Sequence, residues 1–255
     1  MFKRIISLAP SNTEILFSLG LGDKIIGVTR FCDYPKEAKL KTKMGGWVDV
    51  NLDLVKKLEP DLVLTSTIVQ DKISNELKKI SLNVIHLDPI TLEDIFNSIL
   101  EIGKITGTEK KAENLINSMK ERINRLKIRT ENLEKIKIYA EEWHKPPFVC
   151  GNWIPDLIEI ANGIGLSEKA KRSREVSSKE VVEFNPEVIV LTWCGFGDKA
   201  KVDWVRLRPN WDKINAIKNN KIFPFDDSYL NRPGPRIVEG LEKLTRVMHP
   251  EIFEA

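Results

Sequence analysis

The chain has 255 residues, of which 42% are hydrophobic and 30% charged, as expected of a soluble globular protein with one large or two modest domains. Its net charge of +3 comes from 40 basic and 37 acidic residues mixed along the whole length, so no basic block or tail indicates nucleic-acid binding. The apolar stretch at residues 5–9 is too short for a signal-peptide core, and no run of about 18 apolar residues could span a membrane. As written, the sequence therefore predicts a soluble, cytoplasmic protein, or an extracytoplasmic one if a signal was removed.

The first residues predict the start of an α/β lobe. Residues 5–8 (IISL) form a short apolar run typical of a buried strand, and Ser11 to Glu14 match a capping box that opens a helix ending near Gly20. Residues 23–29 predict the next strand. Ligands in open α/β sheets collect at the carboxyl ends of strands, so we expect residues 10–12 and 30–35 to border a cleft.

One segment occurs twice. Residues 51–64 (NLDLVKKLEPDLVL) and 177–191 (SSKEVVEFNPEVIVL) each contain a polar cap, a short amphipathic helix, a proline, an acid and an apolar run. Pro60 and Pro186 lack an N–H and disfavour a helical residue before them, so each ends its helix. The apolar runs are rich in β-branched residues, as in strands covered on both faces. Two copies of one design predict two lobes.

Residues 91–132 show helical periodicity. Ile95, Ile99 and Ile102 keep a spacing of three to four residues, and Met119 and Ile123 continue the stripe on a second helix rich in Lys and Glu. Such helices are stiffer than a Gly/Ser linker, so we expect a rigid connection. The predicted fold is α/β, with an N-terminal lobe at 1–90, connecting helices at 91–132 and a C-terminal lobe at 133–255.

Aromatic residues gather in loops that follow predicted strands. We expect residues 141–155 to form an ordered loop after a strand at 136–140. Aromatic rings with a few polar groups at a cleft suit a large, flat, partly apolar ligand. For Trp47, packing within its own lobe and contact with a ligand remain open alternatives. The residues in these loops are Phe31, Tyr34, Trp47, Trp143, Trp153, Trp193, Phe196, Tyr229, Asp226, Asp227 and Arg232.

Catalysis fits the sequence less well. The three histidines lie in separate segments without the spacing of zinc ligands. His144 and Cys150 could form a nucleophile pair, but no third orienting group is evident. The three cysteines are too few and scattered for a disulfide framework, so we expect reduced, packed thiols. No nucleotide or dinucleotide motif is present, and no resident cofactor is expected.

The order of these segments resembles a known family. SLAPSNTEILFSLGLGDKIIGVTRFCDYP, GGWVDVNLDLVKKLEPDLVL, VSSKEVVEFNPEVIVL and RPGPRI are similar, nearly end to end, to the cobalamin and iron-chelate substrate-binding proteins of ABC importers, and lean to the cobalamin-binding branch. The resemblance implies two Rossmann-like lobes joined by a long rigid α-helix, with a ligand cleft between the lobes. It also implies a monomeric, non-enzymatic binder of a small-molecule chelate, with an ABC permease as a candidate partner.

The same resemblance implies roles for individual residues. Phe31 stands where the cobalamin branch places a tyrosine at the corrin, Trp47 matches a cleft tryptophan, and Arg232 matches a ligand-facing arginine. The family's ligand-facing aspartate falls at Ser228, with Asp227 adjacent. The predicted ligand-binding residues are Phe31, Tyr34, Trp47, Trp143, Trp153, Trp193, Asp227 and Arg232.

Permease docking in this family uses an acid on each lobe. Asp53 fits the first position, but the second holds Lys179, with Glu180 one place on, and one residue turns a helical side chain by about 100°. Asp53 and Glu180 are the predicted docking residues. The leading interpretation is a cobalamin-type binding protein, either an importer component or a soluble relative. A binder of haem or a siderophore is the first alternative, and an enzyme acting on a tetrapyrrole is the second, because fold alone does not fix function.

Overall fold

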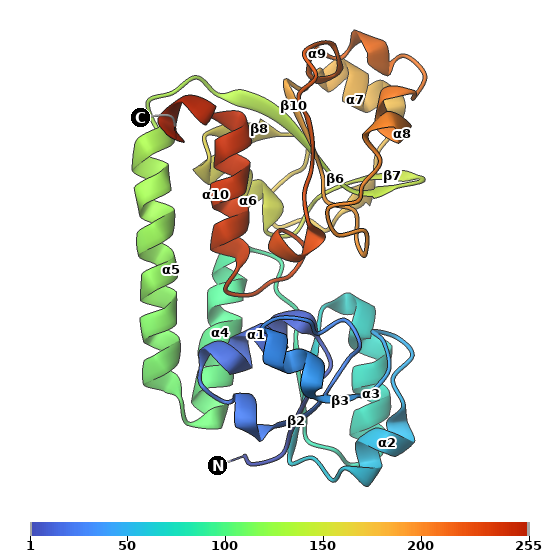
Figure 1. Cartoon of the computed structure of the whole chain (residues 1–255), viewed down its shortest axis with the longest axis vertical. Helices are drawn as coiled ribbons and strands as arrows, with labels where there is room; N and C mark the ends of the chain where they lie inside the picture. Colours follow the sequence, from blue (N-terminus) through green and yellow to red (C-terminus); the bar gives the residue numbers. More distant parts are fainter. Residues whose placement is uncertain (1, 254–255) are drawn as a thin grey trace. The chain divides into compact units, whose positions relative to one another are not determined.

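A computed structural model describes residues 2–253, which divide into two compact units (Figure 1). Unit 1 comprises the chain up to Pro89 together with Glu93–Ser118, and unit 2 comprises Ile90–Leu92 together with the chain from Met119 onward. Each unit is mixed α/β with its own sheet. The predicted α/β class is therefore confirmed.

Unit 1 contains a five-stranded sheet in the order β3-β2-β1-β4-β5, with every neighbouring pair parallel. The central strands are apolar throughout because helices cover both faces of a parallel sheet. The strands are β1 (Ile5–Ser7), β2 (Ile25–Val28), β3 (Thr42–Lys43), β4 (Leu62–Ser66) and β5 (Val84–Leu87). The short helices are α1 (Pro10–Ser18), α2 (Leu52–Lys57) and α3 (Asp71–Lys79).

Two longer helices follow the first sheet. α4 spans Leu92–Thr106 and α5 spans Glu109–Thr130, and the boundary between the two units falls within α5. The predicted apolar stripe is buried. Ile95, Ile99 and Ile102 on α4 are fully buried, and Met119 and Ile123 on α5 are more than nine-tenths buried. The helical periodicity at residues 91–132 therefore marks two real helices.

Unit 2 contains a six-stranded sheet in the order β11-β10-β6-β7-β9, with β8 also paired to β6. The pairings β10–β11, β10–β6 and β6–β8 are parallel, whereas β7 pairs antiparallel with both β6 and β9. The strands are β6 (Ile136–His144), β7 (Pro147–Val149), β8 (Gly163–Gly165), β9 (Arg174–Glu175), β10 (Val188–Leu191) and β11 (Ile222–Pro224). The helices are α6 (Ile154–Ile160), α7 (Ser178–Phe184), α8 (Val202–Arg206), α9 (Asn215–Lys218) and α10 (Ile237–Met248).

The repeated segment adopts the same structure in both units. Asn51 caps α2 by accepting from the Leu54 N–H at 2.9 Å, and Ser177 caps α7 by accepting from the Glu180 N–H at 3.2 Å. Each helix ends before its proline, and each apolar run forms a strand, β4 or β10, paired on both sides. The prediction of two copies of one helix–proline–strand design is confirmed.

The acids that follow the two prolines, Asp61 and Glu187, make equivalent hydrogen bonds in the two units. The Lys3 and Arg4 N–H groups donate to the Asp61 carboxylate at 2.6 and 3.0 Å, and the Lys137 N–H donates to Glu187 at 3.0 Å. In return, the Asp61 and Glu187 N–H groups donate to the Arg4 and Lys137 carbonyls at 2.9 and 2.8 Å. Each acid thus fixes the start of the neighbouring strand, β1 or β6, in register.

Two local predictions were wrong. The capping box at Ser11 does not form, because α1 already begins at Pro10, whose fixed φ suits the first helical position, and Ala9 is the uncapped N-cap residue. Residues 141–144 are not a loop but the end of β6, which turns into β7 as a hairpin. The alternation of aromatic and charged residues in this hairpin hid its strand character.

Candidate ligand-binding site

Unit 1 exposes large apolar side chains where its parallel strands end. Phe31 and Tyr34 follow β2 and are 46% and 47% exposed, Val48 follows β3, and Ile68 and Val69 follow β4. The carboxyl ends of parallel strands share one edge of a sheet, so these loops lie at that edge. We call Phe31, Tyr34, Trp47, Val48, Ile68 and Val69 the strand-end surface.

Polar contacts hold these loops in place. Gln70 accepts from the Ser66 N–H at 2.8 Å and donates to the Leu8 and Trp47 carbonyls at 2.7 and 3.1 Å. The Arg30 guanidinium binds the Asp49 carboxylate through two contacts of 2.8 and 3.2 Å, and this hydrogen bonding lowers the pKa of Asp49. The loops after four strands are therefore tied to one another.

Trp47 is half-buried on this surface. Its carbonyl is fixed by Gln70, yet its buried indole N–H has no acceptor among the described residues. Buried polar groups normally find a partner, so an unpaired donor beside exposed rings favours contact with a ligand over packing alone. The sequence left packing and ligand contact open for Trp47, and the unpaired indole N–H is the observation that favours ligand contact.

Unit 2 gathers its aromatic rings around His144, the last residue of β6. The imidazole centroid lies 4.7 Å from Trp193, 5.1 Å from Trp143, 5.2 Å from Trp204 and 5.4 Å from Phe196. Trp193 and Trp204 are also stacked, with centroids 6.0 Å apart and planes 24° apart. We call these five side chains the aromatic cluster.

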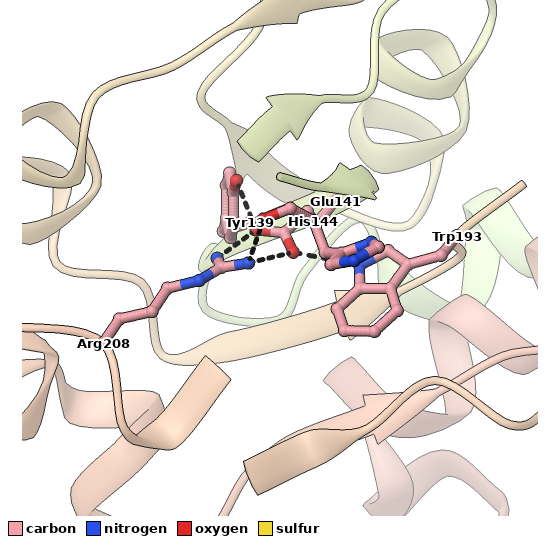
Figure 2. Close-up of polar contacts among 5 residues, drawn as sticks. All are labelled: Tyr139, Glu141, His144, Trp193 and Arg208. Carbon is pink, nitrogen blue, oxygen red and sulfur yellow. Dashed lines mark hydrogen bonds and ion pairs between the residues drawn. The ribbon is translucent and has the colours of Figure 1, made fainter. Parts of the chain in front are cut away.

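A buried carboxylate anchors the aromatic cluster (Figure 2). Glu141 is fully buried and accepts from the Tyr139 hydroxyl at 2.8 Å and from the Trp193 indole N–H at 2.9 Å. The Arg208 guanidinium binds the same carboxylate through two contacts of 2.5 and 2.9 Å, and also donates to the His144 carbonyl at 3.0 Å. Four donors therefore satisfy one buried carboxylate and join β6, the loop after β10 and the segment after α8.

An open hollow lies beside this network. It has a volume of ≈ 400 Å³ and is lined by His144, Lys145, Trp204 and Arg208. Burial lowers the pKa of His144, and Arg208 and Lys145 lower it further against the opposing effect of Glu141. Near pH 7 the hollow is thus lined by a neutral imidazole, an indole and two cations.

The structure separates the predicted unit 2 residues into two groups. Trp143 is 38% exposed and its indole N–H donates to the Lys145 carbonyl at 3.1 Å, so its ring remains available to a ligand. Trp193 and Trp153 are buried, at 0% and 4% exposure, and their N–H groups donate to Glu141 and to the Leu230 carbonyl. The expectation that these two rings face a ligand is corrected, because both are core side chains of unit 2.

The last loop holds two polar candidates for ligand binding, Asp227 and Arg232, and Asp227 already makes hydrogen bonds within unit 2. The Asp227 carboxylate accepts from the Gly195 and Gly197 N–H groups at 3.1 and 2.9 Å, so it organises the loop after β10. Arg232 is half-buried in the turn before α10. Direct ligand contact by either side chain stays a prediction.

The predicted docking acids differ in their surroundings. Asp53 is exposed in the first turn of α2, two residues after the cap. The equivalent position of α7 holds Lys179, which pairs with Glu183 at 3.7 Å. Glu180 lies one residue further on and pairs with Arg174, whose hydrogen bonds lower the pKa of Glu180. Asp53 is therefore open to a partner, whereas Glu180 already has one.

Three important residues were not recognised from the sequence: Glu141, Trp204 and Arg208. Glu141 carried a signal, because an acid inside the apolar run of a strand demands buried partners. Arg208 lies 67 residues away along the chain, and no local pattern links it to Glu141. The sequence suggested His144 as a partner of Cys150. Burial raises the pKa of the Cys150 thiol well above its usual value, so this thiol is no nucleophile.

Within residues 2–253, no group of three or more His, Cys, Asp or Glu side chains is arranged to hold a metal ion. Across the same residues, no helix combines the length and the apolar character needed to cross a membrane.

Comparison with known proteins identifies the family. A family model for periplasmic binding proteins matches residues 5–229. The chain is 33% identical, over 99% of its length and 82% of the relative, to the uncharacterised ABC transporter substrate-binding lipoprotein YvrC of Bacillus subtilis, and 28% identical, over 94% and 86%, to a vitamin B12-binding protein of Vibrio parahaemolyticus. The crystal structure of a possible iron-binding (periplasmic solute-binding) protein from Staphylococcus epidermidis matches with a TM-score of 0.84 and 30% identity, covering 97% of this chain and 99% of that one.

The chain therefore belongs to the periplasmic binding protein family. Members of this family bind substrates for ABC transporters and are not enzymes, so the alternative of a tetrapyrrole enzyme is overturned.

Proposed function

We propose that this chain binds a corrinoid of the cobalamin type and delivers it to an ABC permease. The strand-end surface of unit 1 carries the proposal. Five of its six side chains are at least 46% exposed, and the sixth, Trp47, is half-buried with an unpaired indole N–H. Contiguous exposed apolar groups mark binding sites, and a broad conjugated ring offers the flat apolar area that such a surface accepts.

The relatives support the proposed ligand and also an extracytoplasmic location. Substrate-binding proteins similar to this chain include a vitamin B12-binding protein matched over 94% of the chain. A second relative is a lipoprotein of an ABC transporter, which supports an extracytoplasmic location for this chain rather than the cytoplasmic one expected from its sequence.

The direct test is titration of the protein with cyanocobalamin, followed by absorbance and by quenching of tryptophan fluorescence. Trp47→Ala should weaken binding by about 1–3 kcal/mol, the value of one buried aromatic side chain. The matched control is Ile80→Ala, because Ile80 is a 38% exposed residue at the end of α3 and lies outside the strand-end surface. Equal affinities of the wild type and Trp47→Ala would remove Trp47 from the site.

A second candidate ligand is an iron chelate such as haem or a ferric siderophore. The Staphylococcus epidermidis structure, described as that of a possible iron-binding protein, is 30% identical to this chain and favours this class. The same titration with haemin and with a ferric hydroxamate separates the candidates, because the natural class should bind at least tenfold more tightly than the others.

Delivery to a permease is proposed to use the exposed Asp53 on α2. Asp53→Lys should abolish uptake by the cognate transporter while leaving corrinoid affinity unchanged. Glu180→Lys should have a smaller effect, because the Glu180 carboxylate is already bound by Arg174.

A further inference from the structure

Two glycines that precede Trp47 make room for an ion pair in unit 1. Gly45 has a φ of +109°, which residues with side chains rarely adopt, and a Cβ added there would lie 2.2 Å from the Asp49 carbonyl oxygen. A Cβ added at Gly46 would lie 2.2 Å from Asp49 Oδ1 and 2.6 Å from Arg30 Nη2. Both positions therefore exclude a side chain, and the space beside Gly46 is filled by the paired charges of Arg30 and Asp49.

The Arg30 side chain has two partners. Its guanidinium donates to the Asp49 carboxylate at 2.8 and 3.2 Å, and its central carbon lies 5.1 Å from the centroid of the Phe31 ring. This second distance is within the reach of about 6 Å that a cation–π contact has. The Arg30 N–H also donates to the Gly45 carbonyl at 2.8 Å. The backbone and the side chain of Arg30 are thus both fixed to the turn that carries Trp47.

Phe31 keeps much of its surface open beside this guanidinium. The residue is 46% exposed although Arg30 lies over one face of its ring. An exposed ring on a loop loses rotamer freedom when a ligand binds, and a ring that is already held in one orientation avoids part of that entropic cost. A guanidinium that restricts Phe31 before binding therefore favours binding.

Arg30 is poorly suited to bind a charged group of a ligand directly. Both of its terminal nitrogens donate to Asp49, and this hydrogen bonding is the main reason why the pKa of Asp49 is lowered. The Asp49 carboxylate is therefore ionised at neutral pH and compensates the charge of the guanidinium. What remains available to a ligand at this point of the surface is the Phe31 ring.

We propose that Arg30 is a positioning residue that holds the Phe31 ring so that its uncovered side meets the ligand. This role rests on the proposed function, in which Phe31 contacts the corrinoid. Asp49 and Gly46 act through Arg30, Asp49 by holding the guanidinium and Gly46 by leaving room for it.

The first test is titration with cyanocobalamin. Arg30→Met, which keeps a long side chain without the charge, should weaken binding about two- to fivefold, as expected for the loss of one exposed cation–π contact. Asp49→Asn should act in the same direction, and Arg30→Lys should retain part of the affinity because it keeps a cation. In a Phe31→Leu background, Arg30→Met should have no further effect, because the ring through which Arg30 acts is gone.

The control is Lys72→Met, which removes the charge of an exposed lysine that pairs with Glu76 on α3, outside the strand-end surface. It should leave the affinity unchanged. If the wild type binds cyanocobalamin but Arg30→Met binds it equally well, or if the losses of Arg30→Met and Phe31→Leu add in the double variant, the positioning role is overturned and the proposed function stands.

A second measurement needs no ligand. In protein labelled with p-fluorophenylalanine, the ¹⁹F resonance of Phe31 is assigned by its loss in Phe31→Leu. This resonance should move towards the position of the free amino acid in Arg30→Met and in Asp49→Asn, and should stay in place in Lys72→Met. If the wild type bound no corrinoid, the proposed function would fail and this measurement would decide the role of Arg30 alone. An unchanged Phe31 resonance in Arg30→Met would show that the guanidinium does not hold the ring.

Discussion

The two units place side chains of opposite polarity at equivalent positions of their sheets. Asp61 and Glu187 fix equivalent registers, so Leu8 beside β1 corresponds to Glu141 on β6, and both are fully buried. Unit 1 fills this position with an aliphatic side chain, and its strand-end rings Phe31 and Tyr34 are exposed. Unit 2 fills it with a charge, and Trp193 folds inward to satisfy that charge. In unit 2 the buried carboxylate of Glu141 thus supplies the acceptor for the indole N–H of the buried Trp193.

The largest expected effect comes from making unit 2 resemble unit 1. Glu141→Leu should lower the free energy of unfolding by about 3–5 kcal/mol, because it leaves the Arg208 guanidinium, 12% exposed, without its counter-charge. The double variant Glu141→Leu/Arg208→Leu should recover part of this loss, because it removes the uncompensated guanidinium but still leaves the Tyr139 hydroxyl and the Trp193 N–H without their acceptor. Chemical denaturation of both variants measures the difference, and a single variant as stable as the wild type would show that the ion pair has no structural role.

The indoles of the two units provide the next test. Trp193→Phe should cost about 1–3 kcal/mol, since it removes a donor from a fully buried carboxylate. Trp47→Phe should change stability by less than about 0.5 kcal/mol, because the indole N–H of Trp47 has no acceptor among the described residues. Thermal unfolding of the two variants compares them directly. Equal losses would mean that the hydrogen bond to Glu141 does not distinguish the rings.

Much of the framework could be predicted because its signals are local. Asn51 and Ser177 cap their helices, and Pro60 and Pro186 end them, as the repeated pattern indicated. Whether a given aromatic residue is buried or exposed could not be predicted in this way. Burial of Trp153 depends on the Leu230 carbonyl, 77 residues away, and no sequence pattern reveals such a partner.

The site was predictable only in part for the same reason. Phe31 and Tyr34 lie in the expected loop after β2 and are exposed, because strand ends and their loops follow from short-range patterns. The hollow of unit 2 depends on Arg208 reaching β6 across the fold, and on the hairpin that the sequence presented as a loop.

The two acids that follow the prolines offer a smaller test of equivalence. Asp61→Ala should cost about 1–2 kcal/mol, because its carboxylate accepts two backbone N–H groups, at 2.6 and 3.0 Å. Glu187→Ala should cost about half as much, because Glu187 accepts one, at 3.0 Å. Denaturation midpoints of the two variants give the ratio. A larger loss for Glu187→Ala would contradict the shared role assigned to the two acids.

The smallest expected effect is a pH dependence confined to unit 2. Burial lowers the pKa of His144 below its value of about 6.5 in an unfolded chain, and the facing charges are Glu141, Arg208 and Lys145. Between the folded and unfolded values the unfolded chain binds a proton that the folded chain does not, so the stability that His144 contributes is present above about pH 6.5 and is lost as pH falls. His144→Phe should therefore flatten the decline in melting temperature between about pH 7.5 and 5.5. Phe196→Leu, which removes a neighbouring ring without a titrating group, should lower the melting temperature equally at both pH values, and an unchanged slope in His144→Phe would show that His144 does not set it.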